Sequence, residues 1–453
     1  MKVHFIAIGG SAMHNLAIAL RRKGFEVTGS DDEIFEPSKG RLEREGILPD
    51  TIGWNLDRIH EDLDAIVLGM HAKEDNPELL KAQEMGLKIF SYPEYLYEQA
   101  KDKLRVVIGG SHGKTSITAM ILHVLKYHAI DCDYMVGAQL DGFDCMVKLS
   151  EEAKVTIFEG DEYLSSPIDR RPKFHLYHPD IAILSGIAWD HINVFPTFEI
   201  YLEQFKIFAK EMSAGGTLFY CDQDSNLKTL LADDDIHVEK VPYSIPKHYI
   251  EDGVTALISD DGAEKTQLKI FGKHNLMNLE GARLVCDKLG LGEGEFLKAI
   301  ASFKGASNRL EEVKRSANKV MFKDFAHSPS KVGATVAAVR EQFLNFHLIA
   351  CLELHTFSSL NEEFLLEYLG TLEKADEAIV YFNPHTLEHK KLVPITELQI
   401  KEAFGGNNIK VYTRSMDLIE YLKSLEHNNQ AFLMMTSGNF DGIDFNDLAL
   451  ELV

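Results

Sequence analysis

The sequence predicts an α/β protein with three domains, each built on an open parallel sheet. The chain has 453 residues, which is too long for a single hydrophobic core. Apolar strands alternate along it with helical stretches, and this alternation indicates parallel sheets covered by helices. Each region begins with an apolar strand that runs into a glycine-rich or polar turn. The predicted domains are residues 1–103, 104–307 and 308–453.

The first predicted domain contains the strand, turn and helix of a Rossmann-like fold. Its first strand passes through Gly9 and Gly10 into a helix, and its second strand ends at Asp31. The full G-x-G-x-x-G pattern is absent, because Ala7 and His14 stand where glycines are expected. The turn either holds a pyrophosphate on the helix N-terminus or is an ordinary connection, and the spacing to Asp31 favours a dinucleotide-like ligand. Further strands are expected at residues 64–70 and 87–92.

The second domain opens with VVIGGSHGKTSI, which reads as a strand, a glycine turn and the start of a helix. The usual phosphate loop, G-x-x-x-x-G-K-[ST], needs a glycine where this chain has Ile108, so the loop is shorter. Backbone N–H groups at the helix start can hold phosphate oxygens, Lys114 can neutralise them, and the Thr115 hydroxyl can bind Mg²⁺. A chance GKT sequence is the alternative. The strand and helix around it favour a nucleotide-binding domain of the P-loop ATPase type.

Acidic residues and a histidine end the next two strands of this domain. Glu159, Asp161 and Glu162 end one strand, and Asp190 and His191 follow the other. Ligands gather at the carboxyl ends of parallel strands, so these side chains are candidates for binding magnesium. A helix-capping cluster and a structural histidine are the alternatives. Strands of the domain are expected at residues 155–162, 180–187 and 217–224.

Later motifs supply candidates for contacts with the base, the ribose and the reacting groups. Asn275 and Asn278 stand three apart on one helical face and can bond an adenine edge, with helix capping as the alternative. In KDFAHSPSK, Asp324 can take ribose hydroxyls and His327 can face the reacting groups, although a helix cap explains this motif alone. Arg309 can reach phosphate only when the second and third domains close. Strands of the third domain are expected at residues 319–325, 347–354, 377–383 and 431–437.

The composition excludes several classes of function. The chain has 70 acidic and 47 basic residues and a net charge of −23, which argues against nucleic-acid binding. Its five cysteines form no C-x-x-C pair, which predicts a reduced protein without a structural zinc. No apolar run approaches membrane-spanning length, and the short N-terminal apolar run is unlike a signal peptide. We therefore expect a cytoplasmic protein, a monomer or a homodimer, that has no membrane partner.

Together these motifs resemble those of the Mur ligase family, the ATP-dependent amide-forming enzymes of bacterial cell-wall synthesis. The resemblance extends over the whole chain and preserves the order of five motifs. They are G-[TS]-x-G-K-T at 110–115, E-x-D-E at 159–162, D-H at 190–191, H-N-x-x-N at 274–278 and D-[YF]-[AG]-H-x-P at 324–329. The first domain resembles the muramate-binding branch of the family. This implies that a UDP-sugar contacts Gly9, Gly10, Ser11, Met13 and Asp31.

Within that branch, the chain is more similar to enzymes that attach a whole tripeptide in cell-wall recycling than to enzymes that attach L-alanine. The alanine-attaching enzymes read DES after the strand, whereas this chain reads DEY. DFAHSP also resembles the DFAHHP of the tripeptide enzymes more than the DYGHHP of the others. A second signal is the run Asp169, Arg171, Lys173, Phe174, Tyr177 and Pro179. The alanine-attaching enzymes are the alternative.

The resemblance implies a mechanism with ATP and Mg²⁺. The lactyl carboxylate of UDP-N-acetylmuramate would attack the γ-phosphate, and the amino group of L-Ala-γ-D-Glu-meso-diaminopimelate would then attack the acyl phosphate. Implied catalytic residues are Lys114, Glu159, His191 and His327, and implied metal ligands are Thr115, Glu159 and His191. ATP would contact Gly110, Ser111, His112, Gly113, Lys114, Thr115, Ser116, Asn275, Asn278, Arg309 and Asp324. The third domain would close over ATP and bind the peptide through His355, Thr356 and Ser358.

Four departures from the family pattern concern the amino substrate more than ATP. Phe205 stands where many members have a carbamylated lysine, so Lys206 is not given that role. The other three replacements are Lys323 for an acid, Ser328 for a histidine and Ser359 for an arginine.

Two other classes of function fit parts of the sequence. A nicotinamide-dependent oxidoreductase would use Gly9 and Asp31 but leaves Lys114 and the H-N-x-x-N motif unexplained. A non-catalytic nucleotide-binding regulator would be expected to have lost some of the residues at the phosphate loop.

Overall fold

The structure is a computed structural model, and it describes residues 1–140, 142–189, 194–251, 253–259, 261–262, 265–306, 309–406 and 408–453. These residues form two compact units. The first unit is Met1–Ile245 with Met277–Ala299, and the second is Pro246–Leu276 with Ile300–Val453.

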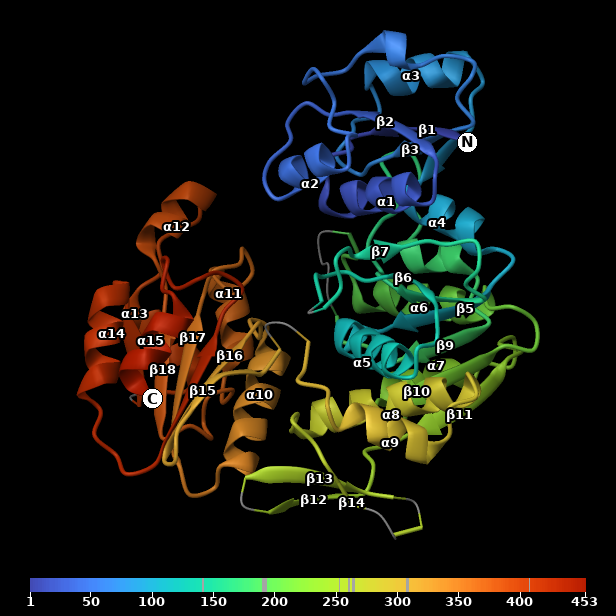
Figure 1. The fold of residues 1–453 in the computed structure, drawn as a ribbon. Coiled ribbons are helices and arrows are strands. Elements are labelled where there is room, and N and C mark those ends of the chain that lie inside the picture. Colours follow the sequence, from blue (N-terminus) through green and yellow to red (C-terminus); the bar gives the residue numbers. More distant parts are fainter. Residues whose placement is uncertain are drawn as a thin grey trace. The chain divides into compact units, whose positions relative to one another are not determined.

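The N-terminal part of the first unit is a four-stranded parallel sheet with the order β2-β1-β3-β4. In Figure 1, α1 and α2 lie on one face of this sheet and α3 lies on the other. The central strands β1 and β3 are almost wholly buried, as expected of parallel strands covered on both faces, whereas the edge strands β2 and β4 are only partly buried. Their bounds are β1 (Lys2–Ile6), β2 (Glu26–Ser30), β3 (Ala65–Leu68) and β4 (Ile89–Ser91). The helices are α1 (Ser11–Arg22), α2 (Ser38–Arg44), α3 (Pro77–Glu84) and α4 (Tyr92–Ala100), and η1 (Leu56–Arg58) is a 3₁₀ turn.

The rest of the first unit is built on a seven-stranded sheet with the order β11-β10-β9-β5-β8-β6-β7. All pairs are parallel except β6 with β7. Since β5 is central, the loop that follows it lies between the ends of β8 and β9. The strands are β5 (Leu104–Gly109), β6 (Asp133–Met135), β7 (Val147–Lys148), β8 (Val155–Glu159), β9 (Ile181–Leu184), β10 (Thr217–Cys221) and β11 (Glu239–Tyr243). The helices are α5 (Lys114–Tyr127), η2 (Lys173–Tyr177), α6 (Phe198–Lys210), α7 (Ser225–Leu231), α8 (Lys273–Lys288) and α9 (Glu293–Ile300).

The second unit contains a six-stranded sheet with the order β15-β16-β20-β17-β18-β19, in which only β15 is antiparallel. One hydrophobic cluster packs α10 and α13 on one face, and another packs α14 and α15 on the other. The strands are β15 (Glu311–Arg315), β16 (Lys319–Asp324), β17 (His347–Glu353), β18 (Glu377–Tyr381), β19 (Ile409–Tyr412) and β20 (Gln430–Met435). The helices are α10 (Pro329–Gln342), α11 (Glu362–Leu365), η3 (Leu366–Tyr368), α12 (Pro384–Lys390), α13 (Glu397–Phe404), α14 (Ser415–Ser424) and α15 (Phe445–Leu452).

The predicted α/β class with parallel sheets is confirmed, but two details differ from the prediction. A small antiparallel sheet was not expected; it consists of β12 (His248–Glu251), β13 (Val254–Ile258) and β14 (Lys265–Gln267). Strands β8 and β9 end three residues earlier than predicted, because the polar residues after Glu159 and Leu184 turn away into loops. Helix α5 begins at Lys114, in agreement with the predicted helix start, and Lys114 and Thr115 therefore lie in its first turn.

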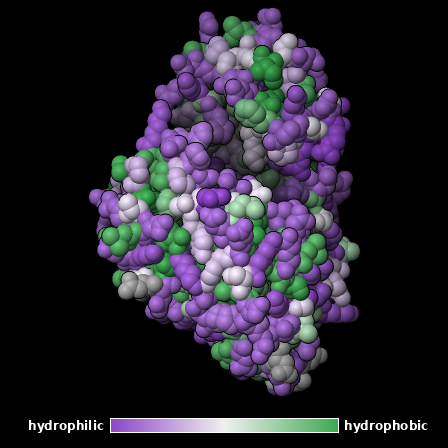
Figure 2. Space-filling model, turned by 90° about the vertical axis from the view of Figure 1, so that its left-hand side faces the viewer, coloured by the Kyte–Doolittle hydropathy of each residue, from purple (hydrophilic) through white to green (hydrophobic). Residues whose placement is uncertain are grey.

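The surface shown in Figure 2 is mainly hydrophilic, and the thiols lie in the interior. Hydrophilic residues dominate the face shown in Figure 2, and hydrophobic ones are scattered among them. Among the described residues, no helix is both long enough and apolar enough to cross a membrane. All five cysteines are buried and none forms a disulfide.

Candidate active site

The shortened phosphate loop after β5 has the backbone geometry of an anion site. Gly110 and Gly113 have φ angles of +123° and +76°, which glycine adopts without strain. A Cβ atom on Gly110 would lie 2.2 Å from Ser185 Oγ, and one on Gly113 would lie 2.2 Å from Asn278 Oδ1. Neither glycine therefore tolerates a side chain. Helix α5 has no side-chain N-cap, so its first N–H groups are placed to bind an anion.

Lys114 is held in a buried polar network at the start of α5. Its Nζ donates to the Gly110 carbonyl oxygen and to Glu162 Oε2, both at 2.7 Å. The Tyr201 hydroxyl donates to Glu162 Oε1 at 3.0 Å and lies 2.8 Å from Ser111 Oγ. Burial alone would lower the pKa of Lys114, but the neighbouring carboxylates, above all Glu162, outweigh it and raise that pKa. Lys114 is thus a fixed cation beside the helix N-terminus.

A hydroxyl and a carboxylate that are suited to bind a divalent cation lie next to this lysine. The Thr115 hydroxyl donates to Glu159 Oε1 at 2.8 Å, and the Gly137 N–H donates to Glu159 Oε2 at 2.8 Å. Burial raises the pKa of Glu159, and the hydrogen bonds and Lys114 only partly oppose it. A hydroxyl and a buried carboxylate are hard donors of the kind that Mg²⁺ prefers, so these residues fit that ion. The third expected ligand, His191, and its neighbour Asp190 lie outside the described residues.

The basic run after Glu162 forms structural contacts. Lys173 Nζ lies 2.5 Å from Asp161 Oδ2, and Arg171 pairs with Asp169 at 2.7 Å. Burial would raise the pKa of Asp161, but Lys173 and Lys114 outweigh it and lower that pKa. The aromatic members of the run are buried as well, since Phe174 stacks on Phe208 and Tyr177 lies against Phe158. The run therefore builds and fixes the hairpin that follows the site.

The two amides of α8 make different contacts. Asn275 Nδ2 donates to the Phe271 carbonyl oxygen at 2.9 Å, one turn back along the chain. Asn278 is buried, and its amide lies against Gly113 of the phosphate loop. The contact of both amides with adenine stays a prediction. Asn278 has a further role, because its side chain also shapes the phosphate loop.

Asp31 closes the glycine turn of the N-terminal sheet. Its Oδ2 accepts from the Gly9 N–H at 2.6 Å, and its Oδ1 accepts from the Asp32 N–H at 3.0 Å. Burial raises the pKa of Asp31 to about 6. Helix α1 begins at Ser11 without a side-chain cap, and Met13 is buried beneath the turn. Asp31 thus positions the turn, and its predicted contact with a ribose stays a prediction.

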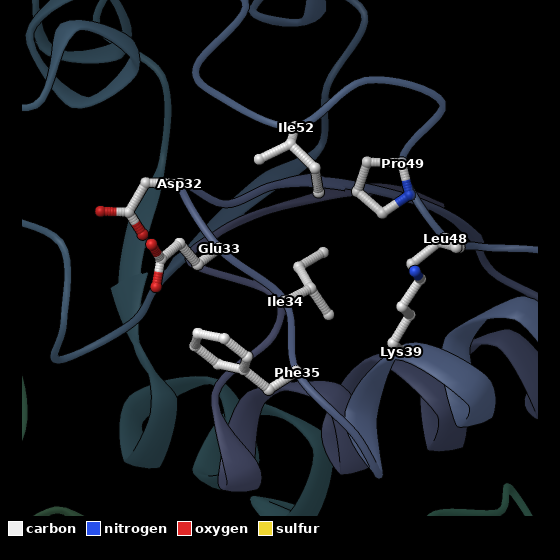
Figure 3. A pocket seen from close by; sticks show the side chains of 8 residues that line it. All are labelled: Asp32, Glu33, Ile34, Phe35, Lys39, Leu48, Pro49 and Ile52. Carbon is white, nitrogen blue, oxygen red and sulfur yellow. The ribbon is translucent and has the colours of Figure 1, made fainter.

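A cavity of about 390 Å³ begins beside this turn and was missed from the sequence. Ile34 Cγ1 lies 3.1 Å from where a Cβ of Gly9 would stand. In Figure 3, Ile34, Ile52 and Pro49 surround the hollow, and the acidic side chains lie together on one side. The lining residues are Asp32, Glu33, Ile34, Phe35, Lys39, Leu48, Pro49 and Ile52. The available signal was the apolar pair Ile34 and Phe35 in DDEIFEP, shortly after Asp31.

In the second unit, Asp324 fastens the chain that enters the six-stranded sheet. Its carboxylate accepts from the N–H groups of Leu310 and Ala326, at 2.5 Å and 2.6 Å. Burial raises its pKa, opposed by those hydrogen bonds. His327 Nδ1 lies 2.8 Å from the Phe325 carbonyl oxygen, and the Arg309 guanidinium lies 4.9 Å from the Phe325 ring centroid. Arg309, Asp324 and His327 are therefore brought together at the end of β16.

The predicted peptide-binding residues follow β17. Thr356 and Ser359 bond each other's backbone N–H groups through their hydroxyls, at 3.1 Å and 3.0 Å, and Ser359 is buried. His355 Nδ1 lies 3.8 Å from Glu353 Oε1, and Ser358 is exposed. Lys323, which replaces a family acid, pairs with Glu311 at 3.2 Å. The arginine expected of alanine-attaching enzymes is thus replaced by a serine that holds a turn.

Comparison with known proteins agrees with these motifs. The model described as "Mur ligase middle domain" matches residues 108–286, and that described as "Mur ligase family, catalytic domain" matches residues 2–104. A UDP-N-acetylmuramate–L-alanine ligase of Ligilactobacillus salivarius is 30% identical over 421 residues, covering 90% of this chain and 89% of the relative.

Two solved structures share the fold over the whole chain. A murein peptide ligase of Psychrobacter arcticus has a TM-score of 0.63 and 22% identity, covering 100% of this chain and 98% of that one. A UDP-N-acetylmuramate-alanine ligase of Thermotoga maritima has a TM-score of 0.68 and 20% identity, with the same coverage. The chain belongs to the Mur ligase family, whose members are ATP-dependent, amide-bond-forming ligases of peptidoglycan synthesis.

Proposed function

We propose that this protein joins the lactyl carboxylate of UDP-N-acetylmuramate to the amino group of L-alanyl-γ-D-glutamyl-meso-diaminopimelate, with conversion of ATP to ADP and phosphate. The observation that carries the proposal is the arrangement of the half-buried Lys114 and Thr115 and the buried Glu159 around the N-terminus of α5. A carboxylate is a poor acylating agent, and this arrangement supplies what its phosphorylation needs. The reaction would take place in the cytoplasm, as part of peptidoglycan recycling.

The chain's own groups perform the binding and the charge stabilisation. The γ-phosphate would lie on the N–H groups that begin α5, and Lys114 would exchange its contact with Glu162 for the phosphoryl oxygens. Thr115 and Glu159 would hold Mg²⁺, which supplies positive charge to the transferring phosphoryl group. His191 would be a further ligand. The acyl phosphate then reacts with the amino group of the peptide, and His327 and Asp324 belong to the part of the chain that would exclude water from it.

The N-terminal sheet would bind the UDP-sugar. The pyrophosphate suits the uncapped N-terminus of α1 beside Gly9 and Gly10. The cavity beside the turn has apolar walls and a volume suited to a nucleobase, so we place the uracil there.

We expect the variant Ile52→Asp to weaken binding of the UDP-sugar. Ile52 lines the cavity and is 58% exposed, so a carboxylate there is tolerated by the fold but disfavours an apolar ring. The KM for UDP-N-acetylmuramate should rise roughly 10-fold or more, while the KM for ATP stays near the parent value. Leu56→Asp, at an exposed apolar residue outside the cavity, is the matched control. Equal effects of the two variants would contradict this placement of the base.

The amino substrate is the finer part of the proposal. Support for a peptide substrate comes from the buried Ser359 in place of an arginine, and from the resemblance of DEY and DFAHSP to the sequences of the tripeptide-attaching enzymes. The 30% identity to an alanine ligase favours L-alanine as the second candidate. The deciding experiment measures ADP release with UDP-N-acetylmuramate and either L-alanine or the tripeptide. We expect turnover with the tripeptide, and turnover with free L-alanine alone would reject this assignment.

A further inference from the structure

Helix α1 and the loop that orients Glu159 are joined by a hydrogen-bonded network that no family motif contains. The loop connects β6 to β7, which form an antiparallel hairpin, and it spans residues 136–146, of which 141 is outside the described residues. Figure 1 shows α1 beside β7. At its start, the Gly137 N–H donates to Glu159 Oε2 at 2.8 Å. The loop therefore carries one of the two groups that fix this carboxylate.

The far part of the loop is held by Arg41 of α2. Arg41 Nη2 donates to the side-chain oxygen of Gln139 at 3.0 Å and to the carbonyl oxygen of Asp144 at 2.6 Å. Its Nη1 donates to Asn15 Oδ1 at 3.2 Å, and Asn15 Oδ1 also accepts from the Met146 N–H at 3.0 Å. Thus Arg41 and Asn15, from two helices that cover the N-terminal sheet, hold both sides of the loop.

The network also reaches the glycine turn. His14 Nδ1 lies 2.9 Å from the Gly10 carbonyl oxygen, and His14 Nε2 lies 3.4 Å from Arg41 Nη1. Burial lowers the pKa of His14, so its ring is neutral and Nε2 accepts from the arginine. The residue that replaces an expected glycine at position 14 therefore connects the turn to Arg41.

Arg41 differs from the two arginines beside it. All three line a cavity of about 200 Å³. Arg22 pairs with Glu45 at 2.5 Å and with Asp144 at 2.6 Å, and Arg44 Nε donates to the Gly40 carbonyl oxygen within its own helix. Among the described residues Arg41 forms no ion pair, and its four acceptors are neutral. Because the guanidinium presents several donors in a fixed plane, it suits a positioning role that lysine fulfils poorly.

We propose that Arg41 is a positioning residue for the ligase reaction, which couples occupation of the glycine turn by the UDP-sugar to the orientation of Glu159 at the nucleotide site. The inference rests on the proposed function, because it takes Glu159 as a Mg²⁺ ligand and the turn as the UDP-sugar site. Groups one shell away from a metal ligand typically change metal affinity or activity by 10- to 100-fold when they are removed.

The experiment compares the parent, Arg41→Ala, Arg41→Lys and the matched control Arg44→Ala. Ligation is measured first as ADP release, and the Kd of Mg²⁺·ADP is then measured with and without saturating UDP-N-acetylmuramate. The parent should bind Mg²⁺·ADP more tightly when the UDP-sugar is present. In Arg41→Ala this enhancement should disappear, and the Mg²⁺ concentration for half-maximal rate should rise on the order of 10-fold. Arg41→Lys should restore little, and Arg44→Ala should behave as the parent.

Each further outcome decides the proposal. If Arg41→Ala fails to fold, Gln139→Ala tests the same hydrogen bond from the loop side and leaves the helices intact. It should also weaken the enhancement of Mg²⁺·ADP binding by the UDP-sugar. A parent that does not ligate overturns the proposed function and this inference with it. A parent that ligates, together with Arg41 or Gln139 variants that keep the enhancement, overturns this inference alone. If Arg44→Ala lost the enhancement to the same extent, the effect would come from the general packing of α2, and the proposal for Arg41 would be overturned.

Discussion

Replacing Lys114 with alanine should reduce ATP-dependent ligation by on the order of a thousand-fold or more, because it removes the cation aimed at the transferring phosphoryl group. The same change removes the ammonium partner of Glu162, a carboxylate that is 1% exposed. Breaking a buried ion pair typically costs about 3 to 5 kcal/mol, so the variant should also unfold at a lower urea concentration. ADP release and urea unfolding measure the two effects separately.

A second variant distinguishes the loss of chemistry from the loss of stability. Glu162→Gln keeps an acceptor for the Tyr201 hydroxyl and removes the buried charge. The double variant Lys114→Ala/Glu162→Gln should therefore recover much of the stability that Lys114→Ala loses, yet stay inactive. If the double variant regained ligation together with stability, the lysine would have only a structural role.

The variant Glu159→Gln should raise the Mg²⁺ concentration needed for half-maximal ligation by at least roughly 10- to 100-fold, the range seen when a group one shell further from a metal is lost. The amide can still accept from Thr115, but its NH₂ group would face the Gly137 N–H. Both the charge and the orientation of this ligand are therefore lost. Titration of the ligation rate with Mg²⁺ measures the effect.

Glu159 should also make the stability of the folded protein depend on pH. Burial raises the pKa of Glu159 in the folded protein, so protonation of this group favours the folded state. The stabilisation that protonated Glu159 contributes is fully present below the ordinary pKa of glutamate. It is lost as pH rises through the raised pKa of Glu159 in the folded protein. Without Mg²⁺, Glu159→Gln should therefore be at least as stable as the parent at neutral pH, whereas exposed Glu84→Gln should change neither stability nor Mg²⁺ dependence. Marked destabilisation by Glu159→Gln would contradict this account.

The sheets were predictable where strands are continuous apolar runs. Strands β5, β17 and β20 are such runs, because parallel strands are covered on both faces. Short or charged strands contain no continuous apolar run by which the sequence would identify them. β7 has only two residues and β15 reads EEVKR, so their places at sheet edges come from pairing with distant segments.

The candidate site was predictable where its residues are contiguous in the sequence. Lys114 and Thr115 belong to one motif, and Glu159 follows the neighbouring strand. Gly137 and Tyr201 were missed, because their contacts with Glu159 and Glu162 span 22 and 39 residues and exist only in the folded chain.

Carboxylates were harder to interpret than cations. Asp31 and Asp324 were predicted as ligand contacts, and both accept backbone N–H groups of their own chain. The sequence cannot distinguish a carboxylate that shapes a turn from one that contacts a ligand. The oxidoreductase alternative, which also depended on Asp31, is replaced by membership of the Mur ligase family.

The buried cysteines make local opening measurable without any engineered label. A buried thiol reacts with an alkylating reagent only when the surrounding structure opens, so its labelling rate reports that opening. Cys351 is the single cysteine of the second unit, and the other four belong to the first. Mass spectrometry of alkylated peptides would therefore report the two units separately. Protection by UDP-N-acetylmuramate and by ATP could then be assigned to one unit or the other in a single sample of the natural sequence.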